Sequence, residues 1–309
     1  MATLAPMRWY TSLIFASLRA ASALPLGFWQ ALGAVSGRLL WRMPTRKRAV
    51  VQANLARVRP RLADDARKKL SRDCLIETGK SLLEVFGIWT RIERTLAAVR
   101  EVRGKELFDE ALASGKGLIL CAPHLGSWEV ANYWIGARTP FATFYTQPRY
   151  PQLELLLRAL REGGASIQFP IDDSGVRRVF RHLGNGGVVS IMPDHVPRSG
   201  GLVAPFFGVP ALTMTLLPRL LRRTPANVLM LFVERLPRAR GFIIHFRATP
   251  AALRDPDLPT ACAALNAAVE ECVRVAFAQY QWNYKRFKPR PGSGLPDIYR
   301  AHSAAGGRG

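Results

Sequence analysis

The sequence predicts an α/β domain in which helices flank a layered, largely parallel sheet. Two short runs of continuous apolar residues, at 117–122 and 187–192, are typical of strands that are buried on both faces. Segments with helical spacing of apolar residues alternate with these runs, as expected for strands joined by helical crossovers. With 309 residues, 49% of them apolar, the chain is long enough to enclose a large core.

The other elements follow from the same criteria. Helices are expected over 64–89, with Asp64 as the N-cap, and over 128–137, 151–161, 176–183, 213–222 and 260–280. Strands are expected over 141–145, 227–233 and 241–247, the last two paired through the loop at 237–240. Residues 301–309 are expected to form a disordered tail.

The N-terminal region has the pattern of a membrane anchor. The first 63 residues carry ten Lys and Arg and no carboxylate, and they contain two charge-poor stretches, 9–18 and 20–37. A basic cluster follows at 38–48, and an apolar segment before such a cluster is typical of an anchor whose basic end is cytoplasmic. We expect residues 1–43 to attach the protein to a membrane, by spanning it or by lying in the interface, and residues 44–300 to form the main domain. A signal peptide cleaved near 21–23 and a buried helix of a soluble protein are the alternatives.

Charge and cysteine usage limit the function classes. The net charge of +22 indicates anionic partners, such as nucleic acid, an anionic membrane, acidic proteins or phosphorylated substrates. The four cysteines form no CxxC pair, which excludes a disulfide scaffold and a zinc knuckle and fits a reducing compartment. The histidines outside the motif described next lack metal-ligand spacing, so no metal site is expected.

Ionisable residues follow both apolar runs, where parallel sheets place their ligands. His124 comes directly after the first run, and Glu129 lies five residues later, in the first turn of the next expected helix. A carboxylate bonded to one imidazole nitrogen fixes the tautomer and leaves the other nitrogen as a base. Gly126 permits the tight turn between them. Asp194 and His195 follow the second run in the same way. Taken alone, the spacing of His124 and Glu129 also fits a structural histidine at a strand end.

Four blocks of sequence together carry a family resemblance. The segment 117–129, GLILCAPHLGSWE, resembles the His-x4-acid signature of the glycerolipid and lysophospholipid acyltransferase superfamily, and more specifically that of the bacterial lipid A biosynthesis acyltransferases. The segments 191–195 (IMPDH), 203–211 (VAPFFGVPA) and 279–291 (QYQWNYKRFKPRP) resemble further blocks of that family, in the same order. The basic, apolar N-terminus followed by Asn54 and Leu55 is similar to the family's membrane-anchoring start. The resemblance covers nearly the whole chain.

This resemblance implies a glycerolipid acyltransferase-like fold over 44–300 and an enzyme at the cytoplasmic face of the bacterial inner membrane. The enzyme would move a fatty acyl chain from an acyl thioester to a hydroxyl of a lipid A precursor. By analogy, His124 would be the general base and Glu129 would orient it. Arg161 and Asp194 would serve substrate binding, Arg161 at a phosphate or the oxyanion and Asp194 as an orienting carboxylate. The thioester is a co-substrate, and no cofactor is expected.

The partners implied are an acidic acyl carrier protein or acyl-CoA, an anionic lipid acceptor and the membrane, all of which a charge of +22 would attract. Thr146 follows Tyr145 where the family often has Arg, and Arg149 lies downstream. Another acceptor, such as a lysophospholipid, an ornithine lipid or a glycolipid, is therefore the alternative. A basic nucleic-acid-binding protein is the remote alternative, and it leaves the His124–Glu129 pair unexplained.

Two further segments have open interpretations. The charge-free run 201–218 contains Phe206 and Phe207 and fits an interfacial segment, the lining of an acyl tunnel or buried packing. Trp282, Arg286 and Lys288 belong to a stretch that mixes aromatic and basic residues, which suits a lipid headgroup interface or a solvated C-terminal segment.

Overall fold

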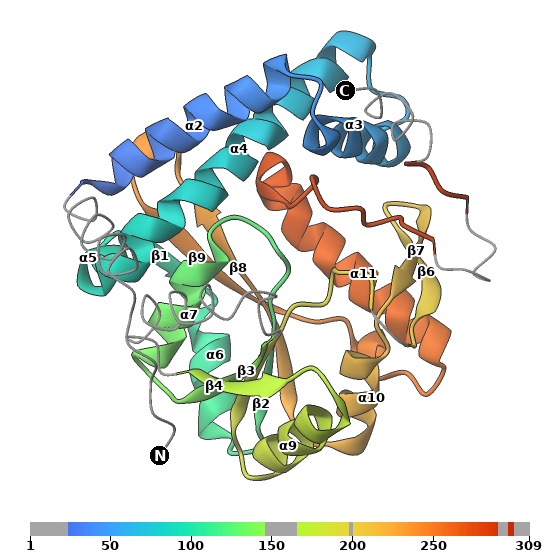
Figure 1. The fold of residues 1–309 in the computed structure, drawn as a ribbon. Coiled ribbons are helices and arrows are strands. Elements are labelled where there is room, and N and C mark those ends of the chain that lie inside the picture. The colour runs from blue at the N-terminus through green and yellow to red at the C-terminus, as the bar shows by residue number, and fades with distance from the viewer. Residues whose placement is uncertain (1–23, 146–165, 198–199, 290–295, 300–309) are drawn as a thin grey trace, which may run out of the picture.

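The fold is built around a seven-stranded sheet (Figure 1). The structure is a computed structural model that describes residues 24–145, 166–197, 200–289 and 296–299. The strand order is β1-β9-β8-β2-β5-β3-β4, and every neighbouring pair is parallel except β8–β9. The α/β class with a largely parallel sheet is therefore confirmed. The strands are β1 (Val99–Arg103), β2 (Leu118–Cys121), β3 (Phe141–Tyr145), β4 (Ser166–Pro170), β5 (Val188–Ile191), β8 (Asn227–Arg235) and β9 (Phe242–Ala248).

The central strands β2 and β5 are buried along their whole length because helices cover both faces of the sheet. In β2, Ile119 and Cys121 join one hydrophobic cluster, whereas Leu118 and Leu120 join the other, as the alternation of side chains along a strand requires. The first cluster includes side chains of α9 (Asp173–Gly184), α10 (Leu216–Arg223) and α11 (Leu258–Val275). The second includes side chains of α6 (Lys105–Ala113) and α7 (Trp128–Gly136).

The N-terminal helices pack on the domain. Helix α2 (Leu26–Arg42) runs along α4 (Asp64–Thr90), while α3 (Arg46–Val58) and α5 (Ile92–Ala97) lie at opposite ends of the pair (Figure 1). The helices touch through backbone, because a Cβ on Gly33 would lie 2.6 Å from the carbonyl oxygen of Gly79. The N-cap of α4 is Ala63, one residue before the expected Asp64.

Of the anchor expected over 1–43, the structure describes residues 24–43. In the described part of the chain, every helix is too short or too polar to cross a bilayer. The expected stretch 20–37 falls largely within α2, which is packed against α4, and the stretch 9–18 lies outside the described residues. The helix expected over 151–161 and the tail at 301–309 also lie outside them.

Both open segments are packed into the domain. The run 201–218 forms an antiparallel hairpin, β6 (Leu202–Phe206) and β7 (Val209–Thr213), which leads into α10 and packs against α11, with Phe206 fully buried. The C-terminal segment follows the 3₁₀ turn η3 (Phe277–Gln279). Within it Trp282 is buried, and buried Arg286 donates hydrogen bonds to the carbonyl of Leu212 and to Asn266. The headgroup-interface interpretation is therefore wrong for Trp282 and Arg286.

Candidate active site

Strand register brings His124 and Asp194 together. Adjacent parallel strands β2 and β5 pair Cys121 with Ile191, and each site residue lies three positions beyond its strand. Since the strands point in the same direction, their carboxyl ends meet at one edge of the sheet. Two residues 70 positions apart in the sequence therefore face each other.

Asp194 holds His124 by two hydrogen bonds. Its Oδ1 lies 2.9 Å from His124 Nδ1, and its Oδ2 accepts the backbone N–H of His124 at 3.0 Å. The Asp194 side chain is 2% exposed and that of His124 13% exposed. Burial alone would raise the pKa of Asp194, but the charge and hydrogen bonds of His124 lower this pKa well below its usual range. The carboxylate is thus charged, fully engaged and directed at one imidazole nitrogen.

The loop that carries His124 is fixed by its backbone. Gly126 has φ +65°, and a Cβ there would lie 1.8 Å from the carbonyl oxygen of Val233 in β8. The amide of Gly126 donates to the carbonyl of Gln279, and the carbonyl of His124 accepts from the amide of Gln281. Only glycine fits this turn, because the required φ is left-handed and the neighbouring strand is close.

Two further aromatic rings stack beside the imidazole–carboxylate pair. The His195 ring lies parallel to that of His124, with centroids 3.9 Å apart and 2° between planes. On its other face lies Tyr284, at 3.9 Å and 13°. His195 Nε2 lies 2.8 Å from the side-chain oxygen of Gln281. Sequence reasoning did not find Gln281 and Tyr284 as site residues, and the PDH triplet at 193–195 was the only local signal for His195.

Glu129 lies in the helix turn where it was expected, while its contact with the His124 ring stays a prediction. It is buried in the first turn of α7, and Asn132 Nδ2 lies 3.4 Å from its carboxylate. Sequence reasoning expected Glu129 to bond the ring of His124, but at Nδ1 the structure places Asp194. Arg161 lies outside the described residues.

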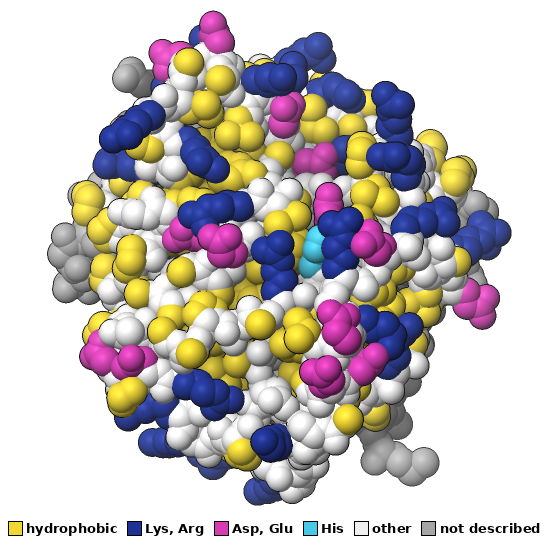
Figure 2. Space-filling model, turned by 180° about the vertical axis from the view of Figure 1, so that it is seen from behind, with side chains coloured by type: hydrophobic (Ala, Val, Ile, Leu, Met, Phe, Trp, Pro, Cys, Tyr) yellow, Lys and Arg dark blue, Asp and Glu magenta, His cyan; other side chains and the backbone are white. Residues whose placement is uncertain are grey.

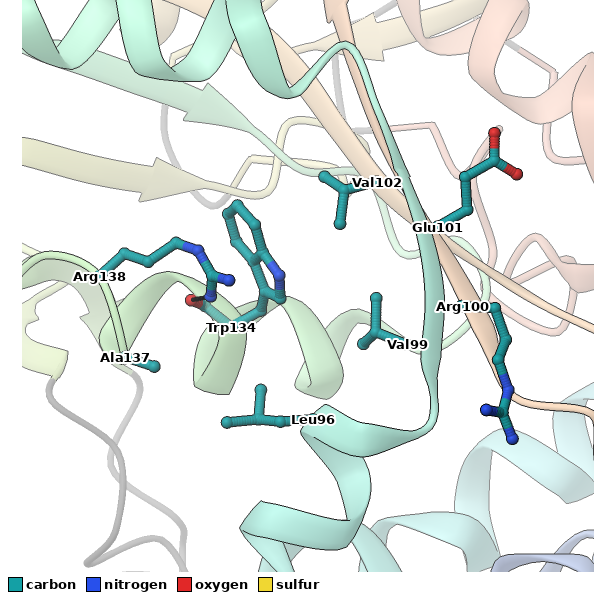
Figure 3. Close-up of a pocket in the computed structure, with 8 residues that line it drawn as sticks. All are labelled: Leu96, Val99, Arg100, Glu101, Val102, Trp134, Ala137 and Arg138. Carbon is teal, nitrogen blue, oxygen red and sulfur yellow. Dashed lines mark hydrogen bonds between the residues drawn. The ribbon is translucent and has the colours of Figure 1, made fainter.

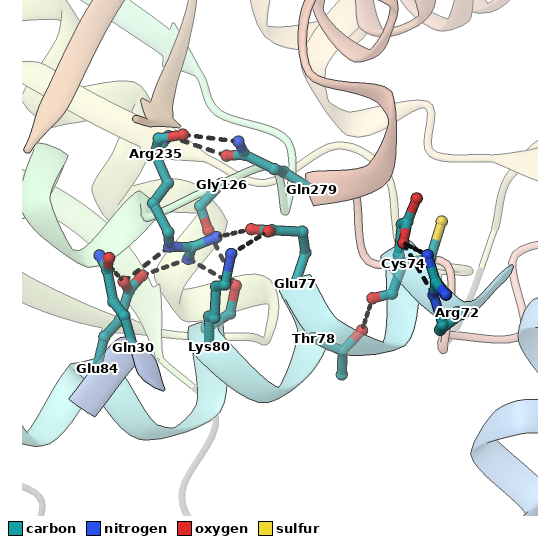
Figure 4. A network of polar contacts seen from close by, with 12 residues as sticks. Gln30, Arg72, Cys74, Glu77, Thr78, Lys80, Glu84, Gly126, Arg235 and Gln279 are labelled. Carbon is teal, nitrogen blue, oxygen red and sulfur yellow. Dashed lines mark hydrogen bonds and ion pairs between the residues drawn. The ribbon is translucent and has the colours of Figure 1, made fainter. Parts of the chain in front are cut away.

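A buried network of ion pairs connects to the segment that holds the His124 loop (Figure 4). Arg235, at the end of β8, pairs with Glu84 and Glu77 of α4, and Gln30 of α2 bonds the same Glu84. Burial alone would lower the pKa of Arg235, but the two carboxylates raise it. Gln279 exchanges two hydrogen bonds with the backbone of Arg235. The network thus links α2, α4 and β8 to the segment that holds the His124 loop.

A surface pocket of about 540 Å³ lies elsewhere, between β1 and the C-terminal end of α7 (Figure 3). Val99 and Val102 of β1 and Trp134 of α7 line it, with Arg138 stacked on Trp134 at 3.5 Å. It shares no lining residue with the His124 cluster. Among the described residues, no group of three or more His, Cys, Asp or Glu is arranged to hold a metal ion.

Comparison with known proteins decides the family. Residues 1–289 match the model of the bacterial lipid A biosynthesis acyltransferases. The chain belongs to this family. The family resemblance inferred from the four sequence blocks is therefore confirmed, and this lipid A acyltransferase family member is an enzyme of the acyltransferase class.

Several named relatives are similar to this family member. The lipid A biosynthesis lauroyltransferase of Escherichia coli (strain K12) is 29% identical over 301 residues, which cover 96% of this chain and 97% of that protein. The phosphatidylinositol mannoside acyltransferase of Mycobacterium tuberculosis (strain CDC 1551 / Oshkosh) is 31% identical over 140 residues, 43% of this chain and 44% of that protein. A lipid A biosynthesis acyltransferase of Haemophilus influenzae is 22% identical over 251 residues, 79% of this chain and 77% of that protein.

Proposed function

We propose that the enzyme transfers a fatty acyl chain from an acyl thioester to a lipid hydroxyl, with Nε2 of His124 as the general base. The observation that carries this proposal is the contact between His124 Nδ1 and the charged Asp194. A carboxylate at Nδ1 keeps the proton on that nitrogen, so the neutral ring has its lone pair at Nε2. Asp194 also stabilises the imidazolium that forms when Nε2 takes a proton.

The transfer proceeds by direct attack. The acceptor hydroxyl gives its proton to Nε2 while its oxygen forms a bond to the thioester carbonyl carbon. The tetrahedral oxyanion then collapses, the carbon–sulfur bond breaks, and the imidazolium returns the proton to the leaving thiolate. All four cysteines are buried, and burial raises the pKa of Cys121, close to His124 in sequence, well above its ordinary value. A thiolate nucleophile is therefore not favoured.

For the acceptor we propose a lipid A precursor, as the name of the E. coli relative suggests. The mycobacterial relative is named for a different lipid, phosphatidylinositol mannoside, which keeps another glycolipid acceptor as the second candidate. An acidic acyl carrier protein or acyl-CoA is the proposed donor, since both are anionic and the chain carries +22. We assign Arg161 to an anionic group of the substrate, as the resemblance implies.

The basic side chains are dispersed on one face of the molecule. On the face shown in Figure 2, Lys and Arg side chains are spread among apolar and acidic ones. They form no continuous basic stripe on that face, whereas such a stripe is the usual electrostatic footprint of nucleic-acid binding.

We further propose that α2 rests on the cytoplasmic face of the inner membrane, in the interface. Its outer face carries a line of exposed apolar side chains with helical spacing, each more than 40% exposed: Phe28, Leu32, Val35, Leu39 and, at its C-cap, Met43. Exposed basic residues, Arg38 and Arg42, lie on the same helix, and the first 63 residues carry no carboxylate. An apolar face with basic residues beside it suits the surface of an anionic bilayer.

Mass spectrometry tests the reaction. A tetra-acylated lipid A precursor is incubated with acyl carrier protein thioesters and with membranes containing the wild type, His124→Ala or the matched control His182→Ala. We expect one added acyl mass with the wild type and the control and none with His124→Ala. Acylation of a glycolipid or lysolipid control instead of the precursor would replace the acceptor. Full activity of His124→Ala would refute the proposed base.

A further inference from the structure

We propose that His195 is a positioning residue for the base: its uncharged ring fixes the plane of His124 and keeps a second positive charge away from it. The inference rests on the proposed role of His124. It concerns a side chain that touches neither the acceptor hydroxyl nor the thioester in the mechanism above, and it gives the third residue of the PDH triplet a function.

The His195 ring is held on both of its faces. The His195 ring is parallel to His124 on one face and to Tyr284 on the other, with centroids 3.9 Å apart in both cases. Tyr284 is itself fixed, because its hydroxyl accepts the backbone N–H of Val196 at 3.0 Å. In the plane of the ring, Gln281 holds His195 Nε2 at 2.8 Å.

The stacked His195 ring supplies an orientational restraint on His124 that Asp194 cannot. The contacts of Asp194 fix the position of His124 Nδ1, but the ring can still tilt about that point. A parallel ring at van der Waals distance opposes the tilt, so Nε2 keeps its direction. The placement of a base within a fraction of an ångström affects the rate steeply.

The surroundings of His195 keep it uncharged. Burial lowers the pKa of His195, and the charges of His124 and Arg286 lower it further, whereas Asp194 and the bond to Gln281 act in the opposite direction. Tyr284, which stacks on His195, is neutral at physiological pH like any tyrosine, and burial raises its pKa further. A proton on His195 would oppose the imidazolium that His124 must form, because the rings are 3.9 Å apart.

The partner of Nε2 fits this role. The Gln281 oxygen accepts a hydrogen bond from Nε2 but carries no full charge, so it orients the ring while favouring its protonation less than a carboxylate would. A glutamate at position 281 would instead stabilise a protonated His195. An amide at position 281, in place of a carboxylate, therefore helps to keep His195 uncharged.

Two substitutions of His195 test the positioning. His195→Phe keeps a flat ring between His124 and Tyr284, and we expect kcat within about threefold of the wild type. His195→Ala removes the stacked ring, and we expect kcat to fall by about tenfold or more with KM nearly unchanged. Equal losses in both variants, with unchanged thermal unfolding, would overturn the proposal. A wild-type kcat in His195→Ala would also overturn the proposal. If His124→Ala is inactive in the same assay, the proposed function still stands.

Gln281→Glu tests the charge. With a carboxylate partner His195 gains a proton, and this charge opposes a second positive charge on the ring 3.9 Å away. We expect the acid limb of kcat/KM to move down by about half a pH unit or more and the maximal rate to fall. In Gln281→Glu/His195→Phe no ring proton is available, so we expect the downward shift to vanish. A shift of equal size in the double variant would show that His195 does not carry it and would overturn the charge argument.

Discussion

Asp194→Asn is the substitution that separates the two carboxylates near the base. It keeps the size of the side chain and removes its charge. Asp194 accepts two hydrogen bonds from His124, through Oδ1 and Oδ2, whereas an asparagine offers one acceptor oxygen. In either orientation of the amide one bond is lost. In one orientation the amide N–H also faces Nδ1, which favours the tautomer that lacks a lone pair at Nε2.

The size of the effect follows from the distance. A carboxylate 2.9 Å from an imidazolium nitrogen contributes about 6 kcal/mol at an effective dielectric constant of about 20. General-base catalysis as a whole accounts for about 10²- to 10⁴-fold, so the loss cannot greatly exceed that range. We expect kcat to fall about 10³-fold or more in Asp194→Asn, with KM little changed.

The assay is the initial rate of acyl transfer across a range of pH, with thermal unfolding of each variant as a control for folding. Glu129→Gln is the matched comparison. Because Nδ1 is bonded to Asp194, we expect this variant to lose less activity and to keep the shape of the pH profile. Less than a tenfold loss in Asp194→Asn, or a larger loss and an altered profile in Glu129→Gln, would refute the reasoning.

Two other predictions concern the supports of the site, and a third concerns the proposed membrane-facing side of α2. Gly126→Ala should abolish activity and lower the free energy of unfolding by about 2 kcal/mol or more, because its Cβ meets the backbone of β8 at 1.8 Å. Gly115→Ala, at the same φ of +65° but with open space around it, should cost only about 1 kcal/mol in denaturant unfolding. Arg235→Met leaves Glu84 buried without its cation and should destabilise the protein by about 3–5 kcal/mol, and adding Glu84→Gln should recover part of that loss. Leu32→Asp/Val35→Asp should weaken flotation with anionic vesicles while Ala113→Asp/Ala252→Asp, on other exposed surfaces, leaves it intact. Unchanged flotation of the α2 variant would rule out that face as the membrane contact.

The local sequence pattern predicted strands correctly where every residue of the strand is buried. Strands β2 and β5 lie between two helical layers, so their apolar runs predicted them closely, and the paired strands β8 and β9 were also predicted. The exposed edge strand β1 was missed. Arg100, Glu101 and Arg103 give it the composition of a loop, and it is a strand only because it pairs with β9, far away in the sequence.

The site shows the same limit. His124 was found because it lies three residues beyond a buried strand. Glu129, five residues away, was expected to orient it, and the resemblance implied Asp194 as a further orienting carboxylate. That Asp194 contacts Nδ1 follows from the sheet register, which joins residues 70 positions apart and is not visible in the local pattern. The packing of α2 was not predictable from composition, since the closeness of Gly33 to Gly79 arises only when two helices meet.

The C-terminal segment has a consequence for biosynthesis. Residues 279–281 hold the His124 loop through the amide of Gly126, a bridge between Leu125 and Tyr280, and the carbonyl of His124. These residues are synthesised after every strand of the sheet. A nascent chain from which residues 279–281 have not yet emerged can form the sheet, but its catalytic loop is not yet held in place. The loop is therefore fixed only after this segment has left the ribosome.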